Sequence, residues 1–453
     1  MTDGYDLVVR APRVITADGE VAWAIGIRDG IITAIDPLEQ AATPGATRVV
    51  RLGDDEVLMP GLVDTHVHIN EPGRTAWEGF RSATRAAGAG GVTTVVDMPL
   101  NSIPPTCTVD ALELKRTSAD GQCFVDVGFF GGAVPENAND LRGLHDAGVL
   151  GFKCFLLPSG VEEFGHLGPD ELEAAMRVVE SLGTTMLVHA EDAAAVEDVP
   201  GADGRAYSTF LASRPRAAEN LAIARVIEVA RRTGCRVHIV HLASAEALPM
   251  IAAARRDGVA LTVETCPHYL TFAAEEIADG ATAFKCCPPI READNREALW
   301  RGLADGTIDL VVSDHSPCTP DLKRTCSGDF GLAWGGISSV QLGLPAIWTA
   351  ARQRGHTLAE VARWMAERPA AFAGLSSKGK IAVGRDADFC VFAPDDGFTV
   401  DTGELFHKNP LTPYDGRPFT GRVRATWLRG NDITTDIEDD VEPQGRLLAN
   451  GGT

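Results

Sequence analysis

The hydrophobic pattern divides the chain into two kinds of segment. Residues 5–36, and near the other end residues 379–392 and 421–430, are rich in Val and Ile and are interrupted by glycine, proline and Asp-Gly pairs. Short apolar runs between turn residues are typical of antiparallel strands. Because both ends share this texture, we predict that residues 1–57 and 376–453 form one small β-sandwich domain.

Between the two ends, apolar runs alternate with helix-like segments. Eight runs are predicted as buried strands: Val57–Ile69, Gly91–Pro99, Phe124–Ala133, Leu150–Leu156, Thr185–His189, Arg236–Leu242, Val259–Thr265 and Ile308–Ser313. Helical patterns are predicted at Trp77–Gly88, Pro169–Leu182, Ala217–Thr233 and Ala245–Asp257. This alternation predicts an α/β protein with a TIM-like (β/α)8 barrel over residues 58–375. A doubly wound open sheet is the competing architecture, but no GxGxxG sequence follows the first strand.

Composition and net charge limit the classes of molecule that this protein is expected to bind. The 453 residues are 45% hydrophobic and 23% charged, as in ordinary globular proteins. The net charge of -22 argues against nucleic acid or an anionic membrane surface as a partner. No apolar run reaches the roughly 18 residues of a membrane span, and the first residues do not form a signal peptide, so we expect a cytoplasmic protein. The ten cysteines are scattered and include no CxxC pair, so we expect most of them to be core residues.

Reactive side chains stand at the ends of the predicted strands. In a (β/α)8 barrel these C-terminal ends form one mouth, so side chains placed there should meet. The candidates end strands one, four, five, six and eight: His66, His68, Lys153, His189, His241 and Asp314. His66 and His68 are two positions apart on a strand and therefore point to the same side. Four imidazoles and a carboxylate at one mouth predict a metal centre.

The lysine in this cluster needs a separate explanation. An ammonium group at Lys153 would repel a metal ion, whereas the carbamate formed from its amine and carbon dioxide is an anion with two oxygens. Such a group could bridge two ions. His238 lies on the same predicted strand as His241 but farther from the mouth, so we expect it to be hydrogen-bonded within the barrel.

In these residues the chain resembles the cyclic amidohydrolases, whose members hold two metal ions with a carboxylated lysine. The resemblance implies two divalent ions, zinc first and otherwise cobalt, manganese or iron. It implies that His66, His68 and Asp314 hold one ion, that His189 and His241 hold the other, and that N6-carboxylated Lys153 bridges them. It further implies a bridging hydroxide as nucleophile, Asp314 as general base, and a homotetramer.

The residues beside these candidate ligands limit which substrates of the family are expected. Dihydroorotases resemble the stretch after the two histidines but carry an arginine where Asn70 stands, an asparagine at Cys287 and a histidine at Cys318. An asparagine cannot pair bidentately with a substrate carboxylate, although it can hydrogen-bond a neutral ureido or imide group. Hydantoinases and dihydropyrimidinases usually place a tyrosine soon after the lysine, where this chain has the sequence LPSG at residues 157–160.

Several motifs are instead similar to the allantoinase group of this family, namely MPLNSIPPT, FKCFLLPSG, KCCPPIR, VSDHSPC and HKNPLTPYDG. This resemblance implies a small-molecule substrate, allantoin, whose cyclic amide is hydrolysed to allantoate in purine catabolism. Candidate substrate contacts are Asn70, Asn101, Cys287, His315 and Ser316, with the backbone around Trp334. A hydantoinase or dihydropyrimidinase is the alternative, followed by a dihydroorotase or a non-catalytic scaffold homologue.

Overall fold

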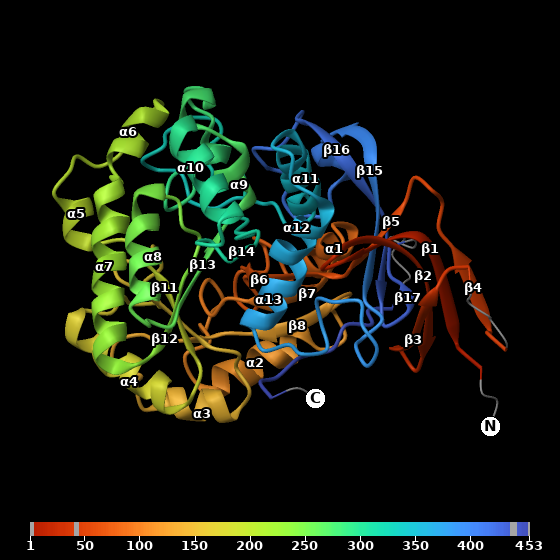
Figure 1. Cartoon of the computed structure of the whole chain (residues 1–453). Helices are drawn as coiled ribbons and strands as arrows, with labels where there is room; N and C mark the ends of the chain where they lie inside the picture. The colour runs from red at the N-terminus through yellow and green to blue at the C-terminus, as the bar shows by residue number, and fades with distance from the viewer. Residues whose placement is uncertain (1–3, 40–44, 435–441, 452–453) are drawn as a thin grey trace.

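The computed structural model describes residues 4–39, 45–434 and 442–451 (Figure 1). The strands are β1 (Leu7–Thr16), β2 (Gly19–Arg28), β3 (Ile31–Pro37), β4 (Arg48–Arg51), β5 (Val57–Pro60), β6 (Leu62–Val67), β7 (Val92–Asp97), β8 (Asp126–Phe129), β9 (Gly131–Gly132), β10 (Phe152–Phe155), β11 (Thr185–His189), β12 (Arg236–Ile239), β13 (Leu261–Thr265), β14 (Leu310–Val311), β15 (Phe389–Thr399), β16 (Pro418–Leu428) and β17 (Asn431–Asp432).

The helices are α1 (Phe80–Ala89), α2 (Val109–Ala119), α3 (Asp140–Asp146), α4 (Pro169–Ser181), α5 (Ala193–Glu197), α6 (Tyr207–Ala212), α7 (Arg216–Thr233), α8 (Leu248–Arg256), α9 (Pro267–Thr271), α10 (Ala293–Ala304), α11 (Gly343–Gln353), α12 (Leu358–Ala362) and α13 (Arg368–Phe372). In the described part of the chain, no helix is both long and apolar enough to span a membrane.

Parallel strands form a closed barrel, as predicted. They pair in the order β6-β7-β8 and, in a second run, β9-β10-β11-β12-β13-β14. The two runs join where β8 continues into β9, because Leu150 N donates to Phe129 O (2.9 Å). The other seam closes where His68 N donates to His315 O (2.8 Å). The predicted (β/α)8 barrel is therefore confirmed, and each predicted strand region contains an observed strand.

The helices cover the outside of this barrel. The four predicted helical segments correspond to α1, α4, α7 and α8, whose ends differ from the expected bounds by at most three residues. Helix α7 buries one face through Ala222, Val226 and Ala230 and ends at Gly234, whose φ of 75° is the left-handed conformation that glycine adopts without strain. Figure 1 shows α4, α7 and α8 on the side of the barrel away from the N-terminal strands.

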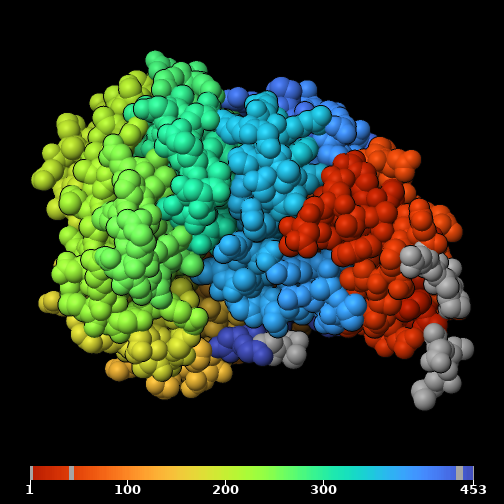
Figure 2. Space-filling model, viewed as in Figure 1, coloured from red at the N-terminus to blue at the C-terminus, as the bar shows by residue number. Residues whose placement is uncertain are grey.

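The two ends of the chain build one β domain beside the barrel, which confirms the predicted terminal β domain. Its strands pair in the order β17-β16-β15-β5-β1-β2-β3, and β4 pairs with β1. Antiparallel pairing of β5 with β15 brings Pro60 opposite Phe389 and thereby joins the two ends. Ile25, Phe389 and Trp427 lie in its own apolar core. Figure 2 shows the N-terminal residues (red) packed against segments of the C-terminal half (blue). The exact division at residues 57 and 376 stays a prediction.

Residues 445–450 leave this domain and lie along the barrel strand β8. Gly445 N donates to Cys123 O (2.8 Å), Leu448 N donates to Val127 O (2.8 Å), and the Asn450 side chain donates to His145 O (2.7 Å). Because β10 reaches β8 only at its end, the start of β8 has an open edge that these residues cover.

A buried charge cluster connects the barrel to the β domain. Lys378 Nζ donates to Asp126 (2.5 Å), the first residue of β8, and to Asp388 (2.7 Å), which precedes β15. It also lies 2.8 Å from Asp386, and Arg429 donates to Asp126 at 2.7 and 2.8 Å. Although burial lowers it, the neighbouring carboxylates raise the pKa of Lys378 above its usual value. The lysine therefore stays charged and neutralises carboxylates from both parts of the protein.

We predict that Lys378→Met lowers the free energy of unfolding by about 3–5 kcal/mol, because it leaves buried carboxylates without their cation. Urea denaturation followed by circular dichroism measures this loss. The control is Lys380→Met: this lysine is half-exposed and pairs with Glu367, so the change should stay within about 1 kcal/mol. Equal effects of the two substitutions would contradict the prediction.

Candidate metal centre

The six predicted metal ligands lie in one cavity of about 530 Å³ at the C-terminal ends of the barrel strands. All of them are buried and line this cavity: His66, His68, Lys153, His189, His241 and Asp314. They come from five different barrel strands or from the residues directly after them. Closure of the barrel is therefore what brings them together.

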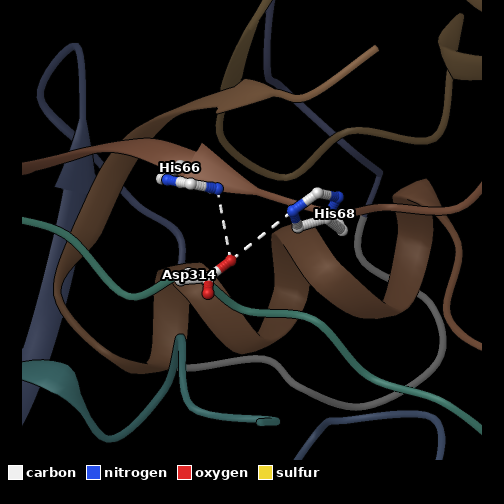
Figure 3. Close-up of side chains that lie close together, drawn as sticks. All are labelled: His66, His68 and Asp314. Atoms are coloured by element: carbon white, nitrogen blue, oxygen red, sulfur yellow. Dashed lines mark ion pairs between the residues drawn. The ribbon is translucent and has the colours of Figure 1, made fainter. Parts of the chain in front are cut away.

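The first group of ligands is His66, His68 and Asp314. Asp314 Oδ1 lies 3.2 Å from His66 Nε2 and 3.5 Å from His68 Nε2, and one ligand atom from each residue falls within 4.8 Å of the others. Figure 3 shows the two imidazoles directed at the carboxylate, one from β6 and one from the residue that follows it. Two imidazoles and a carboxylate at these separations suit one divalent ion.

The second group lies directly beside the first. The ring of His241 is 4.6 Å from that of His189 and 5.4 Å from that of His66. His189 stacks on Phe155 at 4.5 Å, and Lys153 Nζ lies 5.1 Å from the centre of the same Phe155 ring. Lys153 thus stands next to the second group.

The backbone is strained at two of these ligands. His241 has a φ of 40° and Asp314 a φ of 45°, in the left-handed region that residues other than glycine rarely adopt. Such conformations cost of the order of 1–3 kcal/mol and occur where the surrounding structure demands a particular side-chain direction. Here they turn both side chains into the cavity after their strands have ended.

Two buried nitrogen atoms fit the requirement for a metal ion. His66 Nε2 and His241 Nδ1 are buried and have no hydrogen-bond partner among the described residues. Unpartnered buried nitrogens are unfavourable unless something else binds them. Burial lowers the pKa of His68 and of His241, and lowers that of His189 to about 4. These imidazoles are therefore neutral at neutral pH, which is the form that binds metals.

The protonation state of the Lys153 amine is compatible with the carbamate hypothesis. Burial lowers the pKa of Lys153 to about 8. A larger share of the side chain is then a neutral amine at physiological pH than for an ordinary lysine. The neutral amine is the form that reacts with carbon dioxide.

Glu264 supports ligands of both groups and was not predicted from the sequence. This buried glutamate of β13 accepts from His66 Nδ1, from His238 Nε2 (2.9 Å) and from the backbone N of His241 (3.2 Å). Although burial raises it, the nearby His66 and His238 lower the pKa of Glu264 to about 2. His238 also bonds Thr262 Oγ1 (2.7 Å), which confirms the predicted hydrogen-bonded position within the barrel.

A second carboxylate supports His189. Glu191 Oε2 lies 2.7 Å from His189 Nε2, and Arg214 donates to Glu191 through Nε (2.9 Å) and Nη2 (2.5 Å). Glu191 is buried, and Arg214 lines the cavity. Neither residue was predicted. The sequence offers only a weak signal for Glu191, its position two residues after a ligand at a strand end, and none for Arg214.

The predicted substrate contacts divide into two sets. Asn101, Cys287 and Ser316 line the cavity, as does the stretch from Trp334 to Gly336. Two further candidates, Asn70 and His315, do not line it. Asn70 Nδ2 donates to Pro317 O (3.3 Å), while His315 lies between Glu78 (3.3 Å) and the backbone N of Ser339 (3.0 Å). Their contact with substrate stays a prediction.

Comparison with known proteins places the chain among related hydrolases. The profile of the amidohydrolase family matches residues 57–433. An allantoinase from Streptomyces avermitilis is 56% identical over 444 residues, 98% of this chain and 98% of that protein. An allantoinase from Saccharomyces cerevisiae is 51% identical over 398 residues, 86% of each chain. A solved structure, the L-hydantoinase (dihydropyrimidinase) from Arthrobacter aurescens, superposes with a TM-score of 0.91 and 29% identity, covering 98% of this chain and 100% of that one.

We predict that Glu264→Gln weakens divalent metal binding about 10- to 100-fold, because the amide cannot replace a carboxylate that accepts from two histidines. Competition with a chromogenic chelator measures the affinity. The control is Glu360→Gln, which changes a glutamate 3.0 Å from His356 far along the chain from these ligands and should leave the affinity unchanged. Unaltered binding in Glu264→Gln would show that the ligands hold their positions without this carboxylate.

Proposed function

The chain belongs to the amidohydrolase family, and from this premise we propose that it hydrolyses the cyclic amide of allantoin to allantoate. The observation that carries the proposal is the identity of 51–56% to allantoinases over most of the chain, against 29% to the hydantoinase of the same fold. The buried cluster of imidazoles, lysine and carboxylate supports a metal-dependent reaction at one cavity.

The proposed centre holds two divalent ions. His66, His68 and Asp314 would hold one, His189 and His241 would hold the other, and N6-carboxylated Lys153 would link the two groups. When bound, two such ions supply a hydroxide nucleophile at neutral pH and polarise the carbonyl under attack. Zinc as the metal and a homotetramer belong to the same proposal and rest on the resemblance, whereas the cytoplasmic location is the expectation from the sequence pattern.

The chain's own residues bind the substrate and move the proton. The Asp314 carboxylate takes a proton from the attacking water and passes it to the ring nitrogen that leaves. Asn101 and Ser316 offer polar groups to the ring from the cavity wall. Glu264 and Glu191 hold the imidazoles of His66 and His189 in one tautomer, so that a fixed nitrogen faces the centre.

The cavity wall favours this substrate over those of related enzymes. Pro158, Ser159 and Gly160 line the cavity in the stretch where hydantoinases usually have a tyrosine. Outside the cavity lining, Asn70 stands at the position where dihydroorotases have an arginine. A non-catalytic scaffold is disfavoured because all six ligand positions are occupied by suitable residues. Hydantoinase activity remains the alternative, since allantoin is itself a hydantoin that carries a ureido group.

We predict that kcat/KM for allantoin exceeds that for dihydrouracil and for dihydroorotate by at least about 100-fold. The polar groups of the site that bind the ureido group are left without a partner when either of the other substrates is bound. Ring opening is measured with each compound on protein of known zinc, cobalt or manganese content. A preference for dihydrouracil would instead identify a dihydropyrimidinase.

We predict that Lys153→Ala abolishes hydrolysis together with binding of the bridged ion pair. Metal-free wild-type protein should take up two equivalents of zinc only when bicarbonate is supplied, since the carbamate needs carbon dioxide. In Lys153→Ala, zinc uptake should be lower and independent of bicarbonate. Metal analysis after gel filtration provides the stoichiometry, and full activity of Lys153→Ala would exclude the carbamate.

A further inference from the structure

Arg214 is the cation of the cavity wall that remains available to a ligand. Among the described residues, the lysine and arginine side chains that line the cavity are Lys153, Arg214 and Lys285. Lys153 is assigned to the metal centre. Lys285 Nζ donates to the carbonyls of Phe330, Gly331 (3.3 Å) and Ala333 (2.6 Å), which uses its three donors.

The guanidinium of Arg214 is held from one side only. Nε and Nη2 form a two-pronged pair with the Glu191 carboxylate at 2.9 and 2.5 Å. Within the ranges that the structure describes, Nη1 donates to no protein acceptor, and the side chain keeps 18% of its surface exposed. A guanidinium fixed in this way presents the N–H groups of Nη1 in a constant direction at the cavity wall.

The charge of this pair favours a neutral partner. Glu191 is buried and fully neutralises the guanidinium beside it. The pair therefore offers hydrogen-bond donors without net positive charge, which suits the oxygen of a neutral carbonyl better than a second carboxylate.

The Arg214–Glu191 pair lies directly beside one of the candidate metal ligands, at the wall of the same cavity. Glu191 Oε2 also accepts from His189 Nε2 at 2.7 Å, so only one carboxylate separates Arg214 from a metal ligand. In allantoin the ureido group is attached to the carbon adjacent to the carbonyl that is hydrolysed. A ring held at the metal centre therefore carries its ureido group into the adjoining wall.

We propose that Arg214 Nη1 donates to the carbonyl oxygen of the substrate's ureido group and so selects a 5-ureidohydantoin over hydantoins without this group. This inference rests on the proposed function. It assigns Arg214 a contact with substrate in addition to its support of Glu191 and, through Glu191, of His189.

The test compares the binding of allantoin and of hydantoin to the wild-type protein and to Arg214→Lys. This substitution keeps the positive charge and removes Nη1. KM for allantoin should rise about 10- to 100-fold, the effect of losing one charge-assisted hydrogen bond. The inhibition constant of hydantoin as a competitor of allantoin should change less than about threefold. This constant can be measured whether or not hydantoin is hydrolysed. The matched control is Arg216→Lys, two residues away, whose arginine pairs with Glu246 and Glu292 outside the cavity and should affect neither ligand.

Equal weakening of allantoin and hydantoin in Arg214→Lys would reduce Arg214 to a structural role and overturn the proposal. If Arg214→Lys does not fold, the same comparison is made with Arg214→Gln. Failure of both variants to fold would show that Arg214 acts only in stability and would also overturn the proposal. Tighter competition by dihydroorotate than by hydantoin, lost in Arg214→Lys, would mean that Arg214 binds a carboxylate instead. If the wild-type protein does not hydrolyse allantoin, the proposed function fails, and this result is distinct from a failure at Arg214.

Discussion

The candidate metal centre depends on a buried carboxylate that receives hydrogen bonds from several strands at once. Glu264 accepts from His66 of β6, from His238 of β12 and from the backbone beside His241. A lone carboxylate at this depth would be strongly unfavourable, and the three donors make it tolerable. In return, it fixes the tautomer of His66 and leaves Nε2 facing the cavity. The orientation of ligands from distant parts of the chain is thus settled by a single acceptor.

The same arrangement recurs on the other side of the cavity with one addition. Glu191 fixes His189 as Glu264 fixes His66, but its second partner is an arginine that lines the cavity rather than a histidine inside the barrel. The support of His189 and part of the cavity wall therefore belong to one hydrogen-bonded unit. The barrel strands position the candidate metal ligands, and the segments that follow the strands form the cavity wall.

The sequence predicts the barrel and its ligands because both follow from local patterns. Strand-like runs can be recognised residue by residue, and the fold rule then directs attention to their last positions, where His66, His189 and His241 stand. Glu264 and Arg214 are different, since each is an ordinary charged residue in sequence and gains its role only through packing against distant strands. His315 directly follows Asp314 in sequence, yet Glu78 and Ser339 hold its ring outside the cavity lining, so its contact with substrate stays a prediction.

The pairing of β5 with β15 has a consequence for how the protein is made. Residues 57–60 pair with β1 on one side, but their partner on the other side is complete only when residues 389–392 have left the ribosome. Until then one edge of β5 has unpaired backbone groups, while the barrel residues that separate β5 from β15 are being synthesised. The final residues 445–450, which cover the start of β8, arrive later still. The β domain of this molecule is therefore completed from the two ends of the chain, after translation of the barrel.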